Sequence, residues 1–148
     1  MTQFDEALAA AIKLLERSDM FESELRSRLS AYDEELKTSV IERLKSRRLL
    51  DDRRLAHSLA DRRSGKRSVG FARLEAELAR RGASGELIQE LRQSFSEGEG
   101  AWQALAARFD PDIDDRAKAA RFLASRGFEE DEIRSSIDEF FHSVSEFA

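Results

Sequence analysis

Cysteine is absent from this 148-residue sequence, and proline occurs only once. The absence of cysteine excludes disulfide bonds and thiolate metal sites, and it fits a cytoplasmic protein. One proline and seven glycines leave few residues that interrupt a helix. No apolar run approaches the roughly 20 residues that cross a membrane, and the acidic N-terminus has no signal-peptide pattern. The sequence therefore predicts a nearly all-helical, cytoplasmic protein.

Patterns typical of enzymes are also missing from the chain. There is no Gly-rich phosphate loop, no nucleophile–base pattern and no spacing of metal ligands. The two histidines, His57 and His142, lie far apart in the sequence and are expected to be ordinary side chains. Asp51 and Asp52 precede a predicted helix, so we expect them to be caps rather than acid–base catalysts. We predict a protein that is not an enzyme and that uses no cofactor and no metal.

The net charge of −5 is unevenly distributed along the chain. Residues 42–81 contain thirteen Lys or Arg against six Asp or Glu, a net charge of +7, and the remainder carries −12. Such a basic middle between acidic ends makes the molecule electrically polar. An acidic partner is therefore expected to bind the middle of the chain.

Helical periodicity recurs along the chain with a period near 45 residues. Residues 73–88 and 119–133 each place a leucine four positions before a glycine and an isoleucine six positions after it. Glycine there predicts a helix C-cap in the left-handed conformation. A looser copy without the glycine begins at residue 24. We predict an all-α fold of three tandem three-helix repeats in an elongated, curved array: residues 1–50, 51–96 (basic) and 97–148 (acidic).

Local signals place several helix boundaries within these repeats. Residues 96–100 (SEGEG) are expected to form a flexible linker. Ser68 is a predicted cap of the fifth helix, after a turn over residues 64–68. The start of the eighth helix is left open between three aspartates: Asp110, Asp112 and Asp114. Aromatic side chains at helical spacing are expected in the core, among them Trp102, Phe109, Phe122 and Phe141.

Three motifs follow one another in a characteristic order. Residues 49–56 are LLDDRRLA, residues 70–82 are GFARLEAELARRG and residues 121–128 are RFLASRGF. Together they resemble the RecX family, the regulators of the RecA recombinase. The chain departs from the family pattern in having Leu55 in an aromatic position and Phe71 in place of proline.

The resemblance implies a protein without catalysis that lies in the deep groove of the RecA–DNA filament and bridges neighbouring RecA subunits. It implies inhibition of RecA ATP turnover, strand exchange and co-protease activity, in recombination and in the SOS response. The expected partner is the RecA filament on single-stranded DNA, with a weak direct DNA contact through the middle repeat, no membrane contact and a monomeric chain. The alternative is a helical nucleic-acid-binding protein that acts without RecA.

The residues expected to bind the partner lie in the basic middle. Arginine suits acidic protein surfaces and DNA alike, because its planar fork pairs with a carboxylate or a phosphate. Lys66 and Arg67 lie in a predicted turn, where side chains are free to reach a partner. The alternative is a solvated face with helical ion pairs such as Glu77 with Arg81. The candidate set is Arg47, Arg48, Arg53, Arg54, Arg62, Arg63, Lys66, Arg67, Arg73, Arg80 and Arg81.

Overall fold

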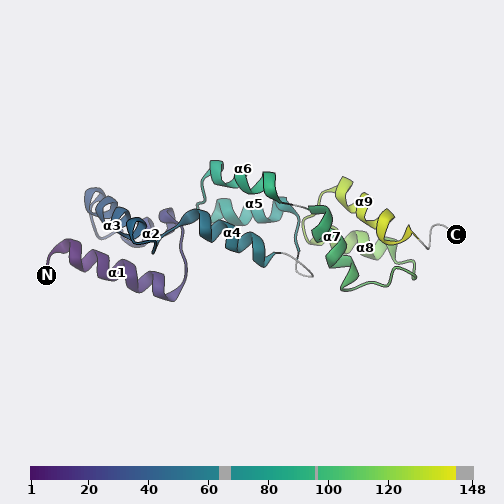
Figure 1. Ribbon diagram of the computed structural model, residues 1–148, viewed down its shortest axis with the longest axis horizontal. Helices are drawn as coiled ribbons and strands as arrows, with labels where there is room; N and C mark the ends of the chain where they lie inside the picture. Colours follow the sequence, from purple (N-terminus) through teal and green to yellow (C-terminus); the bar gives the residue numbers. More distant parts are fainter. Residues whose placement is uncertain (64–67, 96, 143–148) are drawn as a thin grey trace.

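The computed structural model describes residues 1–63, 68–95 and 97–142 of the chain. These residues form nine α-helices and no strand, which confirms the predicted all-helical fold. The helices form three groups that follow one another along the long axis of an elongated molecule, with the N-terminal group at one end and the C-terminal group at the other (Figure 1). None of the helices in the described ranges is long and apolar enough to cross a membrane.

The first group of helices consists of α1 (Gln3–Arg17), α2 (Glu22–Arg28) and α3 (Glu34–Ser46). The side chains of Thr2 and Asp33 accept backbone N–H bonds at the starts of α1 and α3, which satisfies donors that the helices leave free. Apolar residues spaced three or four apart then face one another in a buried cluster: Ala7, Ala11, Leu25, Leu29, Val40, Ile41, Leu44 and Leu50.

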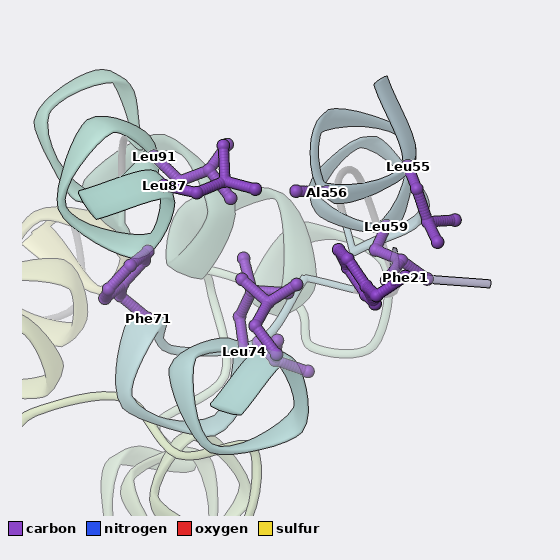
Figure 2. Close-up of a cluster of buried hydrophobic side chains, with 10 residues drawn as sticks. Phe21, Leu55, Ala56, Leu59, Phe71, Leu74, Leu87 and Leu91 are labelled. Atoms are coloured by element: carbon purple, nitrogen blue, oxygen red, sulfur yellow. The ribbon is translucent and has the colours of Figure 1, made fainter. Parts of the chain in front are cut away.

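The middle group consists of α4 (Asp52–Arg62), α5 (Phe71–Arg80) and α6 (Gly85–Ser94). Ser84 caps α6 as predicted, because its Oγ accepts the Leu87 N–H at 3.2 Å. The buried cluster of this group includes one residue that precedes α2 in the sequence, Phe21, which lies among leucines of the middle group (Figure 2). The other members are Leu55, Ala56, Leu59, Val69, Phe71, Leu74, Leu78, Leu87 and Leu91.

The third group consists of α7 (Glu97–Ala106), α8 (Arg116–Ser125) and α9 (Glu130–Phe140). Its buried cluster contains Ala101, Ala104, Leu105, Ala119, Leu123, Phe128, Ile137, Phe140 and Phe141. All helix pairs with extensive contacts lie within one group, so each group has its own core. The division of the chain into repeats at residues 50 and 96 stays a prediction.

Three helices end in the same turn, in which the residue after the C-cap has a positive φ. Gly82 (φ 92°) ends α5 and Gly127 (φ 83°) ends α8, as the sequence predicted, and Arg48 (φ 59°) ends α3. In each turn the next N–H bonds to a leucine carbonyl five residues back, at 2.9 to 3.2 Å. This is the Schellman motif, which favours glycine because a Cβ is strained there. Arg48 therefore adopts a conformation that glycine would adopt without strain.

Three local predictions were wrong. Of the predicted linker over residues 96–100, residue 96 lies outside the described residues and residues 97–100 belong to α7, where Gly98 and Gly100 allow close approach to side chains of other elements. The N-cap of α5 is Gly70, while Ser68 is buried. Trp102 is 44% exposed and meets Phe140 edge to face at 5.8 Å, although it was expected in the core.

The start of α8 and the aromatic core also differ in detail from the predictions. The N-cap of α8 is Asp115, and of the three expected aspartates Asp114 accepts the Arg116 N–H at 3.3 Å. Phe141 is fully buried as predicted, whereas Phe109 and Phe122 are only partly buried and pack against each other at 5.7 Å. These details depend on how the helices of the third group pack.

Candidate functional site

Four of the candidate arginines have partners inside the molecule. Arg53 pairs with Glu90 across α4 and α6, and Arg63 donates to Glu77 at 2.9 Å. Arg73 donates to the Ser125 carbonyl at 3.2 Å, and Arg81 pairs with Glu24. Three of these contacts join residues 37 or more positions apart, and the pair of Arg63 with Glu77 joins the end of α4 to α5. The four side chains therefore help to hold the fold, whatever else they bind.

Five other candidates are exposed, and their side chains have no hydrogen bond or ion pair within the described ranges. Two of them follow α3, two lie on α4 and one ends α5: Arg47, Arg48, Arg54, Arg62 and Arg80. We call these five residues the exposed arginines. Lys66 and Arg67 lie outside the described residues. Because the exposed arginines have no partner among the described residues, their guanidinium groups are available to an external acidic surface.

Arg81 occupies the contact between the first and middle groups, which we call the first junction. Its Nε and Nη2 each donate to one oxygen of Glu24 at 3.1 Å, and Nη2 also donates to the Asp19 carbonyl at 3.0 Å. The guanidinium carbon lies 5.3 Å from the centre of the Phe21 ring. The expected helical pair of Glu77 with Arg81 is therefore wrong, because each residue pairs with a different helix.

The two aspartates of the LLDD motif cap two different helices. Asp51 caps α4, since its Oδ1 accepts the Arg54 N–H at 3.1 Å. Asp52 accepts the Glu22 N–H of α2 at 2.8 Å, so it caps a helix of the first group. Burial raises the pKa of the Asp52 carboxyl above its usual value of 3.8. Both residues therefore act as caps, as the sequence predicted, and Asp52 also contributes to the first junction.

The contact between the middle and third groups, which we call the second junction, has the same arrangement of residues as the first junction. Arg126 precedes Gly127 as Arg81 precedes Gly82, and it donates to the Ser68 carbonyl at 3.1 Å. Ser68 lies two residues before the N-cap of α5, as Asp19 lies two residues before the N-cap of α2. The Gly70 N–H also donates to the Arg126 carbonyl at 2.9 Å. Each junction thus places an Arg-Gly turn against the start of a helix in the preceding group.

Arg126 was missed by the sequence interpretation, which confined the candidates to residues 47–81. The signal was available, because Arg126 matches Arg81 in the two copies of the leucine–glycine–isoleucine pattern. Its role in the junction depends on the spatial contact between α8 and residues preceding α5. Charge counting along the chain could not reveal that contact.

Two hollows border the second junction. The larger, about 570 Å³, lies between α4, α6 and α7, with a mixed lining that includes His57, Phe95 and Gln103. The smaller, about 240 Å³, is lined among the described residues by Arg63, Val69, Arg73 and Arg126. We call this smaller hollow the arginine pocket. No group of His, Cys, Asp or Glu in the described ranges is placed to hold a metal ion.

The fold and these surfaces define an elongated, all-helical array with exposed arginines on its middle part. No family model matches the chain. Regulatory protein RecX of Chromohalobacter salexigens is 38% identical over 138 residues, which cover 86% of this chain and 88% of the relative. Regulatory protein RecX of Chlorobium phaeobacteroides is 30% identical over 148 residues, which cover 96% of this chain and 98% of the relative.

The fold is also that of a solved relative. The crystal structure of RecX from Lactobacillus salivarius matches 93% of this chain and 96% of its own chain, with a TM-score of 0.75 and 19% identity. The chain belongs to the RecX family of regulatory proteins, as its sequence motifs indicated.

Proposed function

We propose that this chain regulates the RecA recombinase, as an inhibitor, by binding in the groove of the RecA filament on single-stranded DNA. Membership of the RecX family, at 38% identity over most of the chain, carries this proposal. Bound there, the chain would impede RecA ATP turnover, strand exchange and co-protease activity in recombination and the SOS response. The elongated arrangement of three helix groups is suited to contact more than one RecA subunit (Figure 1).

The exposed arginines are the proposed contact with the filament. They extend from the end of α3 to the end of α5 and carry charge that no described internal partner balances. Guanidinium groups of this kind steer an acidic partner and set orientation more than they add to affinity. In this proposal the basic middle recognises the filament, and the three buried clusters stabilise the fold.

The direct test is DNA-dependent ATP hydrolysis by RecA of the same organism on single-stranded DNA, with this protein titrated in. Inhibition at concentrations well below those that bind naked DNA is the expected result. If inhibition instead tracks the binding of naked DNA, the alternative of a nucleic-acid-binding protein that acts without RecA is favoured.

A pair of matched variants locates the contact. Reversing the charge of Arg54, Arg62 and Arg80 together to Glu should raise the half-inhibitory concentration roughly ten-fold or more, since each is exposed and unpaired within the described ranges. Reversal of three exposed cations outside the middle group serves as the control: Arg28, Lys118 and Arg121. Equal loss in both variants would show that net charge, rather than this surface, governs the inhibition.

A further inference from the structure

Trp102 on α7 is the most exposed aromatic side chain among the described residues, with 44% of its surface open to solvent. Its ring meets the ring of buried Phe140 edge to face at 5.8 Å, and Phe140 belongs to α9, which packs against α7 (Figure 1). The contact with Phe140 holds the indole in place while the rest of the ring faces solvent. Tryptophan is enriched among the residues that dominate the binding energy of protein interfaces. Trp102 is therefore a candidate anchor for a partner.

Carboxylates accompany this tryptophan. Glu99 lies one helical turn before Trp102, and its described bond comes from the uncharged Gln103 amide at 3.4 Å. Glu139 precedes Phe140 in α9 and is exposed, without an ion pair in the described ranges. Residues 97–142 contain twelve Asp or Glu against six Lys or Arg, a net charge of −6. We call Trp102, Glu99 and Glu139 the α7–α9 surface; its partner has to be cationic.

Aromatic rings elsewhere in the molecule already have their cations. Five described arginines lie over phenylalanine rings, with the guanidinium carbon of Arg92 4.6 Å from the centre of Phe71 and that of Arg43 5.2 Å from Phe4. No described cation lies over Trp102, although indole is the aromatic ring that attracts cations most strongly. The cation that fits the α7–α9 surface has to come from another molecule.

The chain itself carries suitable cations. The exposed arginines lie in the basic middle, where residues 42–81 have a net charge of +7 against −6 for residues 97–142. A planar guanidinium stacks on an aromatic ring and pairs with a carboxylate better than an ammonium does. The basic middle of one copy is thus complementary, in charge and in chemistry, to the α7–α9 surface of a second copy.

We propose that copies of this chain associate head to tail, with the exposed arginines of one copy bound to the α7–α9 surface of the next. Two different surfaces meet in this contact, so every associated pair keeps one free surface of each kind and further copies can add. The monomer expected from the sequence then prevails only in dilute solution. The contact goes beyond the proposed regulation of RecA and does not depend on it, but it uses the same arginines and therefore competes with binding to the filament.

Trp102 is the only tryptophan of the chain, so its fluorescence reports on this surface alone. Dilute wild-type protein is titrated with the variant Trp102→Phe, which we call the dark copy because it contains no tryptophan. The dark copy supplies the arginines, and its binding should shift the emission of Trp102 to shorter wavelengths in a saturable way. Added salt should weaken the association, because it screens exposed charges.

Two charge-reversed dark copies locate the contact. Reversal of Arg54, Arg62 and Arg80 to Glu should raise the half-saturating concentration roughly ten-fold or more. Reversal of three exposed cations outside the middle group is the matched control and should change it little: Arg28, Lys118 and Arg121. Circular dichroism checks that both remain helical. An emission that the unmodified dark copy leaves unchanged would overturn the proposal, as would equal weakening by both reversals.

Sedimentation velocity tests the same contact from the other side. The sedimentation coefficient of the wild type should rise with protein concentration, whereas that of Trp102→Ala should not. Ile113→Ala is the control, since Ile113 is a 56% exposed apolar residue of the third group outside the α7–α9 surface, and it should behave as the wild type does. An oligoarginine peptide that shifts the emission of Trp102 when the dark copy does not would overturn the assignment to a second copy.

Discussion

The residue before α2 at the first junction is Phe21, and the residue in the same position before α5 at the second junction is Gly70. Phe21 is fully buried in the core of the middle group, so the first junction shares apolar surface between two groups (Figure 2). Gly70 has no side chain, and a Cβ there would lie 1.9 Å from the Gly127 carbonyl oxygen. The second junction is therefore a direct contact of two backbones.

This difference shows that one Arg-Gly turn can be used in two ways. At the first junction the turn is held by side chains: Glu24 pairs with Arg81, and the Ser23 hydroxyl donates to the Gly82 carbonyl at 3.1 Å. The second junction is bordered by two hollows, and the smaller hollow is the arginine pocket. Burial of a phenylalanine stabilises the first junction, whereas the absence of a side chain makes the second possible.

Removal of the Phe21 side chain, which the first and middle groups share, should have the largest effect on stability. Phe21→Ala is expected to lower the free energy of unfolding by about 3–5 kcal/mol, because it opens a cavity in the middle core. Urea denaturation followed by circular dichroism measures the change. Phe4→Ala is the control, since Phe4 is only partly buried and packs against the first core. An equal loss in both variants would show that Phe21 does not link the two groups.

A side chain at the second junction should force the two backbones apart. Gly70→Ala is expected to cost about 1–3 kcal/mol through the clash with Gly127, and to lengthen the molecule in small-angle X-ray scattering. The control is Gly85→Ala, because a Cβ at Gly85 meets nothing within 4 Å and alanine favours the helix. An unchanged scattering profile for Gly70→Ala would contradict a close backbone contact.

A substitution in the turn after α3 should have a smaller effect and should raise stability instead of lowering it. Arg48→Gly should raise the free energy of unfolding by about 1 kcal/mol, because Arg48 has a φ of 59° and glycine adopts this conformation without strain. Arg47→Gly is the matched control, since Arg47 has a φ of −95° and gains nothing from glycine. Thermal unfolding separates the two variants. A loss of stability in both would mean that the arginine side chain matters more than the backbone strain.

The smallest predicted effect depends on pH. Burial raises the pKa of Asp52 in the folded state, so ionisation of its carboxyl opposes folding above that pKa, and the penalty disappears below the unfolded value. Asp52→Asn keeps an acceptor for the Glu22 N–H and should gain roughly a few tenths of a kcal/mol at pH 7. The difference in the free energy of unfolding between Asp52→Asn and the wild type should disappear as the pH falls below 3.8.

Asp52→Ala is the comparison for this last prediction. It removes the acceptor at the start of α2 and should lose about 1 kcal/mol at neutral pH. Melting temperatures measured between pH 3 and pH 7 distinguish the two variants. A loss in Asp52→Asn as large as that in Asp52→Ala would show that the negative charge itself stabilises the first junction.

Much of the local structure could be predicted from the sequence. The helices, the caps at Asp51 and Ser84 and the left-handed turns at Gly82 and Gly127 depend on residues a few positions apart. The candidate surface was predicted less completely. Charge counting found the basic middle, but it could not separate Arg54, which is exposed and unpaired in the described ranges, from Arg63, which pairs with Glu77. That separation depends on which helices face each other.

By itself the sequence determined the helical class, the polar distribution of charge and the motifs of the RecX family, because composition and periodicity are properties of neighbouring residues. Only the tertiary structure decided that Phe21 belongs to the core of another group, that Asp52 caps α2 and that Arg126 contributes to the arginine pocket. These contacts join residues of separate helix groups, 30 positions apart in the case of Asp52 and Glu22, and their formation depends on packing rather than on local preference.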